Sequence, residues 1–246
     1  MGRNEVTSTW QGIWRDRKDR LAAPGAPSPI FHALREIAGS LGGKSVLEPG
    51  SGIGEISIHM AREGAKVVLL DISPDALELS RRFFRERGLQ AEFVLGDIFR
   101  MPFPENRFDI VWNAGVVEHF RPEDQVSALR EFARVAKPGG LVITFNPNAR
   151  ARLYRWGKRV GEERGTWEFG EEYPVESMDA AASASGLVLE REFSIFFERS
   201  ISFLRYVSPL VFRLVKAAYV LSGGNRNPLW QRLLGGYLLA SVMRKP

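Results

Sequence analysis

Three glycines at alternate positions, Gly50, Gly52 and Gly54, follow a short buried strand that we expect over residues 45–47. Because glycine has no Cβ, it lets a ligand approach the backbone and permits a tight turn. A loop that binds the pyrophosphate of a dinucleotide would carry its third glycine where this chain has Glu55. The spacing therefore favours a different cofactor loop, and a glycine-rich turn without a ligand is the alternative.

Two carboxylates follow the next two predicted strands. Asp71 comes 19 residues after Gly52, where an acid can accept hydrogen bonds from both hydroxyls of a ribose. A cap for the next helix is the other role open to Asp71, although Ser73 already suits that purpose. Asp97 ends the third strand and could accept the exocyclic amine of adenine; its alternative role is an Asx turn.

The elements that must position these residues alternate between short apolar strands and amphipathic helices. That alternation predicts βαβ units and an α/β fold with a mostly parallel sheet. The expected strands are 45–47, 66–71, 91–95, 108–113, 141–145, 187–197 and 236–243. The expected helices are 28–41, 53–64, 74–88, 122–137, 150–164, 175–185 and, interrupted near Pro209, 201–221.

The composition is that of an ordinary globular protein. Of 246 residues, 44% are hydrophobic and 26% are charged, and a single domain of this length is common. The chain has no cysteine, which excludes disulfides, thiolate metal sites and cysteine nucleophiles, and we expect no metal site. The polar segment Met1–Arg20 lacks the apolar core of a signal peptide, and no apolar run is long enough to span a membrane. We therefore expect a cytoplasmic protein.

The charge is unevenly distributed along the chain. Residues 199–246 hold eight basic residues and no acidic one, whereas the whole chain has a net charge of +5. Within this region, residues 199–231 are also strongly apolar. Three roles are open to them: a lid over a hydrophobic pocket, an interfacial segment in peripheral contact with an anionic membrane, or a helix pair packed in a core or a dimer.

Over roughly residues 40–150 the sequence resembles the class I S-adenosylmethionine-dependent methyltransferases, especially their type 11 branch. The resemblance implies a Rossmann-like fold, with a seven-stranded and mostly parallel sheet, an antiparallel last strand and a helical insertion before that strand. It rests on the run 48–54, on Asp71, on 96–98 with 101–103, on 107–111, on 113–119 and on 135–140.

The same resemblance implies S-adenosyl-L-methionine as the cofactor and a set of residues that hold it. Glu48 would orient the methionine amino group, Asp71 the ribose, and Asp97 and Ile98 the adenine. The backbone of 113–115 would line the methionine end. The implied cofactor-binding residues are Glu48, Gly50, Ser51, Gly52, Gly54, Asp71, Ile72, Asp97, Ile98 and Asn113.

His119 is the candidate catalytic residue on the acceptor side. It lies just beyond the fourth strand, where open α/β sheets bind ligands, and its pKa range suits a general base. A packing role before the helix at Pro122 is the alternative. Trp10 and Trp14 are four residues apart on an expected N-terminal helix. They either cover the cofactor or pack the N-terminus on the domain.

These observations predict methyl transfer to a small or lipid-like molecule, on oxygen or nitrogen, by in-line displacement. The alternatives are a methyltransferase acting on nucleic acid (RNA), for which no appended motif is present, and a non-catalytic scaffold that keeps the cofactor fold. We expect one domain over 1–246, and the sequence leaves the oligomeric state open. Its expected parts are an N-terminal helical cap (1–41), a cofactor-binding core (42–147), substrate-side loops and a lid (148–235) and the last strand (236–246).

Overall fold

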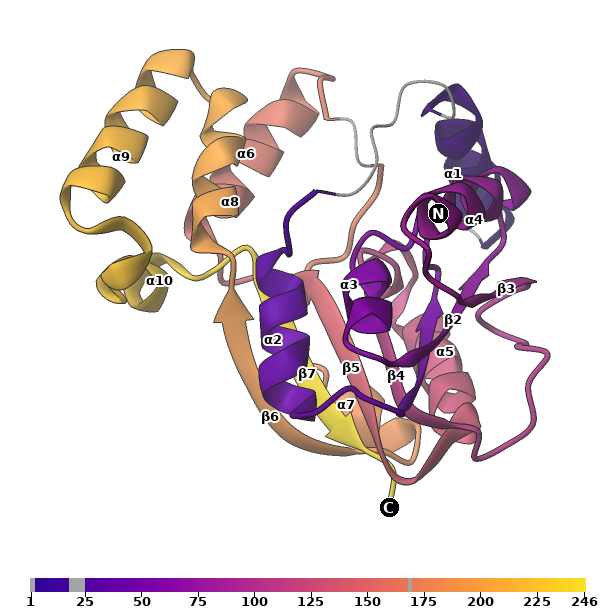
Figure 1. Cartoon of the computed structure of the whole chain (residues 1–246). Coiled ribbons are helices and arrows are strands. Elements are labelled where there is room, and N and C mark those ends of the chain that lie inside the picture. The colour runs from indigo at the N-terminus through magenta and orange to yellow at the C-terminus, as the bar shows by residue number, and fades with distance from the viewer. Residues whose placement is uncertain (1–2, 18–24, 168–169) are drawn as a thin grey trace.

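One seven-stranded sheet organises the computed structural model, which describes residues 3–17, 25–167 and 170–246. The strand order is β3-β2-β1-β4-β5-β7-β6, and only β7 runs antiparallel to its neighbours (Figure 1). The predicted fold is therefore confirmed. The strands are β1 (Ser45–Pro49), β2 (Lys66–Asp71), β3 (Glu92–Leu95), β4 (Phe108–Ala114), β5 (Ala136–Pro147), β6 (Val188–Ile195) and β7 (Leu238–Arg244).

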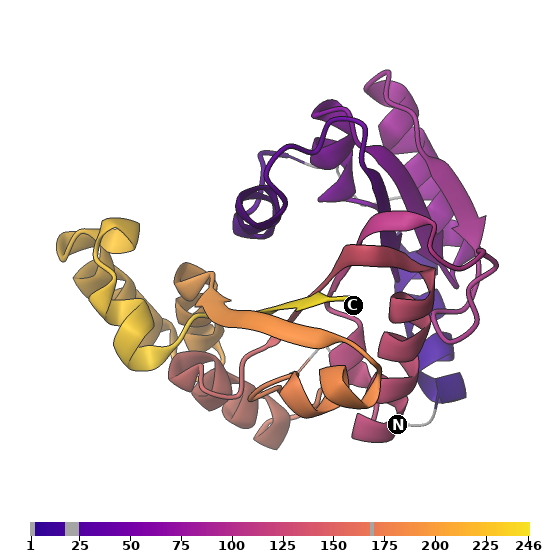
Figure 2. The same cartoon turned by 90° about the horizontal axis from the view of Figure 1, so that it is seen from below.

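Helices cover both faces of the sheet. One hydrophobic cluster packs α2, α3 and α4 against one face, and a second packs α5 and α7 against the other (Figure 2). These helices are α2 (Pro29–Ala38), α3 (Ser57–Arg62), α4 (Pro74–Glu86), α5 (Pro122–Val135) and α7 (Asp179–Ala184). The sheet is apolar on both faces for this reason, as parallel sheets are.

The helix starts follow the local sequence. The side chain of Ser28 accepts a hydrogen bond from the amide of Phe31, and that of Ser73 from the amide of Ala76. A proline opens each of the two helices, α2 and α4. The expected helix over 53–64 begins only at Ser57, because Gly52 and Gly54 have positive φ and belong to the turn before it. The expected helix over 175–185 is likewise shorter, and α7 begins at Asp179.

The remaining helices gather at the edge of the sheet where the parallel strands end, the upper edge in Figure 1. They are α1 (Arg3–Arg17), α6 (Arg152–Glu163), α8 (Phe197–Ser202) and α9 (Pro209–Leu221), with α10 (Leu229–Leu234) below α9. Two 3-10 turns, η2 (Phe203–Arg205) and η3 (Gly224–Arg226), lie between them. The helical insertion predicted before the last strand is thus present, and Pro209 interrupts it by starting α9 after the capping residue Ser208.

None of the helices in the described part of the chain is long and apolar enough to cross a membrane.

Candidate active site

A cavity of about 510 Å³ opens at the carboxyl ends of β1, β2 and β4. The chain runs outward from β1 through β2 to β3 and then returns to β4 on the other side of β1. Such a reversal leaves a crevice between the two loops, and open α/β sheets bind ligands there. The glycine loop, the ends of β2 and β3, the segment after β4 and the helix α1 form the walls.

Gly52 and Gly54 of the glycine loop make different contacts. A Cβ on Gly52, whose φ is +52°, would lie 2.6 Å from the indole of Trp14, so α1 packs directly on the loop. Gln11 supports this position of α1, since its side chain donates to the carbonyl of Ile72 at 3.3 Å. A Cβ on Gly54 would instead meet Leu69 at 2.6 Å, below the cavity. Gly52 thus lets α1 pack closely on the cavity wall, whereas Gly54 lets the loop pack closely against β2.

Asp71 holds the glycine loop and the end of β2 together. One carboxylate oxygen accepts the amide of Gly52 at 2.7 Å, and the other accepts the amide of Ser73 at 2.8 Å. Burial raises the pKa of Asp71, and these two hydrogen bonds oppose the rise. Each carboxylate oxygen can accept more than one hydrogen bond, so the side chain keeps acceptor capacity for ligand hydroxyls at the cavity wall.

Unsatisfied polar atoms mark the end of the cavity near β1 and β4. Among the described residues, Glu48 Oε2 and Ser51 Oγ in the cavity wall, and both polar atoms of the Asn113 amide behind it, are buried without a hydrogen-bond partner. Buried polar groups of this kind are costly unless a ligand or water satisfies them. Burial also raises the pKa of Glu48 well above its usual range, which a neighbouring ammonium group would reverse. The residues present therefore fit the amino-acid end of S-adenosylmethionine.

Eight of the ten cofactor-binding residues expected from sequence line this one cavity. They are Glu48, Gly50, Ser51, Gly52, Asp71, Ile72, Asp97 and Ile98. Gly54 and Asn113 do not line it: Gly54 packs on β2, and Asn113 is buried in β4 one residue before Ala114, which does line the wall. Asp97 is exposed at the rim and accepts the amide of Phe99 at 2.9 Å.

His119 lies behind the wall of the cavity. Its ring meets the ring of Trp10 edge-on at 5.3 Å between centroids, and Trp10 itself lines the cavity. Nδ1 is 2.9 Å from the carbonyl oxygen of Glu171, an acceptor, so Nδ1 carries the proton and Nε2 keeps a free lone pair. Burial lowers the pKa of His119, with smaller opposing effects from Glu171 and Glu172. The imidazole is therefore neutral at pH 7 and able to take a proton.

Glu118 is a second buried acid beside the cavity. Only 2% of the residue is exposed, and Oε2 has no hydrogen-bond partner within the described residues. A Cβ on Gly115, which lines the cavity, would lie 3.9 Å from Glu118 Oε1. Burial raises the pKa of Glu118 to about 8, so this carboxyl is protonated at neutral pH.

Three further ionisable residues join this region, and sequence reasoning missed two of them, Lys158 and Glu172. Tyr154 donates a hydrogen bond to Glu172, and Lys158 Nζ lies 3.9 Å from the same carboxylate. The side chains of Lys158 and Glu172 are each 4% exposed. Electrostatic coupling to Glu118 and His119 contributes to the pKa of Glu172, which burial raises. Tyr154 and Lys158 are four residues apart on α6, a spacing that could have placed them on one helix face.

Aromatic rings enclose these ionisable groups. Tyr154 contacts Phe203 and Tyr237, each at 5.0 Å between ring centroids, and Lys158 lies 4.8 Å from the ring of Trp167. The close approach of η2 to α6 depends on Gly157, where a Cβ would lie 2.4 Å from the carbonyl oxygen of Phe203.

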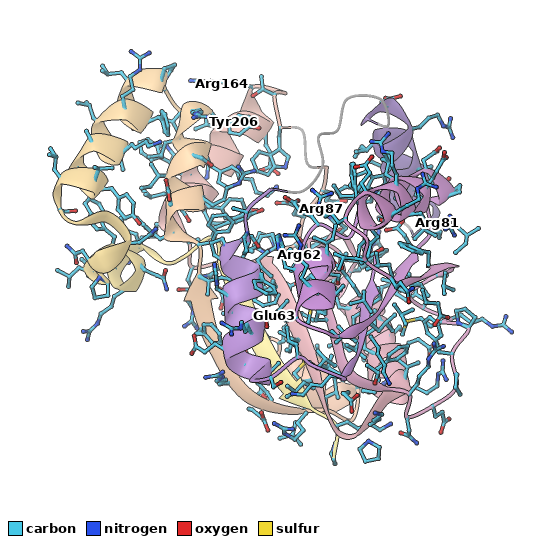
Figure 3. All side chains as sticks on the ribbon, in the orientation of Figure 1. Arg62, Glu63, Arg81, Arg87, Arg164 and Tyr206 are labelled. Carbon is cyan, nitrogen blue, oxygen red and sulfur yellow. The ribbon has the colours of Figure 1, made fainter. Side chains whose placement is uncertain are left out.

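The far end of α6 is tied to the same insertion. Arg164 donates to the carbonyl of Tyr206 at 2.7 Å, and both residues lie at the top of the molecule (Figure 3). The insertion is therefore anchored beside the aromatic enclosure.

Replacing Glu118 by glutamine should stabilise the protein at alkaline pH. The folded-state pKa of about 8 lies above the unfolded value of 4.5, so the native state retains a proton that the unfolded state releases between these values. The native state accordingly loses stability as pH rises through this window. We expect Glu118→Gln to raise Tm by roughly 5–10 °C at pH 8, corresponding to a few kcal/mol, and by little at pH 5.

Thermal unfolding at both pH values measures this difference. The exposed Glu36, on α2, supplies the control Glu36→Gln, which should change Tm little at either pH. Equal shifts for the two variants would contradict the assignment of a buried, protonated Glu118.

Comparison with known proteins identifies a methyltransferase family. A family model described as a methyltransferase domain matches residues 46–140. The ubiquinone biosynthesis O-methyltransferase of Bordetella bronchiseptica is 31% identical over 194 residues, which cover 74% of this chain and 78% of that protein. The ubiquinone/menaquinone biosynthesis C-methyltransferase of Azotobacter vinelandii is 36% identical over 126 residues, covering 48% of this chain and 49% of that protein. The chain thus spans most of the first relative and about half of the second.

Solved structures agree on the fold. The magnesium protoporphyrin IX methyltransferase of Synechocystis PCC 6803, with bound S-adenosylhomocysteine, superposes with a TM-score of 0.64 over 99% of both chains at 17% identity. At that identity the similarity establishes the fold alone. The cavity lined by the glycine loop lies at the switch point of the sheet, and the sequence similarity extends well beyond it. The chain belongs to the class I S-adenosylmethionine-dependent methyltransferases.

Proposed function

We propose that this enzyme methylates a hydroxyl or amine of a small, ring-bearing, lipid-like acceptor, with His119 as the general base. One observation carries the proposal: the neutral His119 contacts Trp10, which also lines the cofactor cavity. The acceptor site would begin where these two rings meet. The names of two relatives, enzymes of ubiquinone biosynthesis, support a small lipid-like acceptor.

The cofactor would lie along the residues of the glycine loop and the strand ends. Asp71 would bind the ribose hydroxyls, Asp97 and Ile98 the adenine, and Glu48 the amino group. S-adenosylmethionine supplies a methyl group that passes to the acceptor in one in-line displacement, the S–C bond breaking with its electron pair left on sulfur. The residues of this chain then act by positioning both partners and excluding water.

His119 would accept the proton that the acceptor loses. The hydrogen bond between Nδ1 and the carbonyl of Glu171 directs the imidazole to use Nε2. The protonated Glu118 could donate a hydrogen bond to a polar group of the acceptor, because its pKa of about 8 keeps it neutral at pH 7. General-base catalysis of this kind contributes on the order of 10²- to 10⁴-fold in rate.

The segment 148–235 would form the acceptor side and its lid. Tyr154, Phe203 and Tyr237 pack on one another as an aromatic cluster beside the ionisable groups, and this cluster would support the wall of the acceptor site. Contact of residues 199–231 with a membrane surface would bring a lipid-like acceptor to this side. Within the expected cap over 1–41, we also propose that α1 covers the cavity, since Trp10 and Trp14 line it, whereas α2 packs on the sheet.

A transfer assay with ¹³C-methyl-labelled S-adenosylmethionine tests the proposal. The acceptors to compare are a dihydroxybenzene that carries a long alkyl tail, the same ring without the tail, and total RNA. We expect label in the tailed ring compound, and carbon NMR of the product distinguishes a methyl group on oxygen from one on carbon. A labelled methyl group on carbon would show that the acceptor atom is not oxygen, and it would contradict His119 as the base for a hydroxyl. Label in nuclease-sensitive material would overturn the acceptor class, and cofactor binding without transfer to any acceptor would favour a scaffold.

A further inference from the structure

A second, larger groove of about 930 Å³ lies between α6, α10 and the outer strand β6. It shares no lining residue with the cofactor cavity. The helices α9 and α10 beside it form the end of the molecule remote from α1 and α4 (Figures 1 and 2). The arginines that line the groove are Arg150, Arg152, Arg155, Arg159 and Arg232.

These five guanidinium groups form no ion pair within the described part of the chain. Two carboxylates share the groove. Glu192 accepts the amide of Met178 and the hydroxyl of Ser241, and Glu176 is exposed, so two carboxylates stand against five arginines. Arginine offers a planar fork of donors that matches phosphate oxygens. The groove therefore has the charge and donor geometry for a phosphate-bearing ligand.

Exposed apolar side chains lie in the groove and on α9, the helix above α10 in Figure 1. Trp156 in the groove is 45% exposed, and Leu233 of α10 is 66% exposed. On α9, Leu210, Leu214 and Leu221 are exposed by 64%, 62% and 86%. Their spacing of four and seven residues puts them on one side of the helix. A helix in a soluble protein normally turns such a row toward its core.

We propose that α6, α9 and α10 form a binding site for an anionic phospholipid bilayer, in which the groove's arginines hold headgroup phosphates. The leucines of α9 and α10 would enter the apolar zone beneath the headgroups. This inference rests on the proposed membrane contact of residues 199–231, adds the arginines of α6 to it, and does not depend on the methyl-transfer chemistry.

The charges favour a bilayer over a second copy of the chain. A symmetric dimer through this surface would bring Arg213 and Lys216 of α9 toward their own counterparts, and residues 199–246 contain no acid to offset them. An anionic bilayer offsets the same charges and accepts the leucines.

Cosedimentation of the full-length protein with vesicles tests the proposal. We expect binding to vesicles of phosphatidylglycerol and phosphatidylcholine, little binding to phosphatidylcholine alone, and weakening by salt. The double variant Arg155→Glu/Arg159→Glu should bind at least roughly 30-fold more weakly, since each basic residue near such a surface contributes about fivefold. The matched control Arg62→Glu/Arg85→Glu reverses two exposed arginines, Arg62 at the end of α3 (Figure 3) and Arg85 on α4, and should bind as the wild type does.

A second variant and a soluble ligand separate the other outcomes. Leu214→Glu should also weaken vesicle binding, while S-adenosylhomocysteine affinity stays unchanged in every variant. Glycerol phosphate that binds with the same dependence on Arg155 and Arg159, without vesicle binding, would show a soluble phosphate ligand and overturn the bilayer. A wild-type dimer that Leu214→Glu dissociates, again without vesicle binding, would show that a second copy covers α9 and would also overturn it.

Discussion

Replacing Asp71 by alanine is expected to lower the affinity for S-adenosylhomocysteine by about a hundredfold or more. The carboxylate already organises the loop through the amides of Gly52 and Ser73, and we expect it to accept the ribose hydroxyls as well. Hydrogen bonds to a charged group contribute about 1.5–3 kcal/mol each, and about 1.4 kcal/mol corresponds to a tenfold change in affinity. Titration calorimetry of the purified variant measures the effect.

Two further variants separate ligand binding from loop collapse. Asp71→Asn keeps one carbonyl oxygen for the loop amides and should lose affinity less than the alanine variant. Asp97→Ala removes an exposed carboxylate at the rim and should cost about tenfold, as a single hydrogen bond does. Unchanged affinity in a folded Asp71→Ala protein would exclude Asp71 from the cofactor site.

Replacing His119 by asparagine should lower kcat by about a hundredfold or more and leave cofactor affinity almost unchanged. Asparagine preserves a donor near the carbonyl of Glu171 but cannot accept the acceptor's proton. Single-turnover transfer, once an acceptor is known, measures the chemical step. The exposed His32, on α2, supplies the control His32→Asn, which should retain wild-type activity.

The pH dependence of kcat/KM distinguishes a general base from a residue that only packs, because only a base titrates with the activity. Because burial lowers the pKa of His119 below 6.5, wild-type kcat/KM should be constant near neutral pH and fall only below pH 6.5, as the base becomes protonated. The asparagine variant should lose this acidic limb. Full activity in His119→Asn, or an unchanged profile, would assign the residue to packing.

The cofactor half of the molecule could be predicted because short-range rules govern it. Gly52 lies in the loop after β1 and Asp71 ends the adjacent parallel strand β2, so this topology brings them together. The length of the glycine turn could not be predicted from helix periodicity, which placed the start of α3 four residues too early. The role of Gly54 could not be predicted either, because only its contact with Leu69 shows that this glycine faces the core.

The acceptor half depends on contacts between segments distant in sequence. The buried Glu172 lies beside Tyr154 and Lys158 of α6, and no local pattern marks a loop carboxylate as buried. The same holds for Arg155 and Arg232, which belong to α6 and α10 and meet only in the folded groove. The sequence indicated a basic and apolar C-terminal region, but not that α6 would share its surface.

The most direct test of the account is a crystal structure of the protein with S-adenosylhomocysteine. We expect the nucleoside between Asp71 and Asp97, the amino group beside Glu48, and the sulfur at the end of the cavity nearest Glu118 and His119. A ligand bound in this cavity in the reverse direction, or bound elsewhere on the chain, would contradict the cofactor site and the role of His119 together.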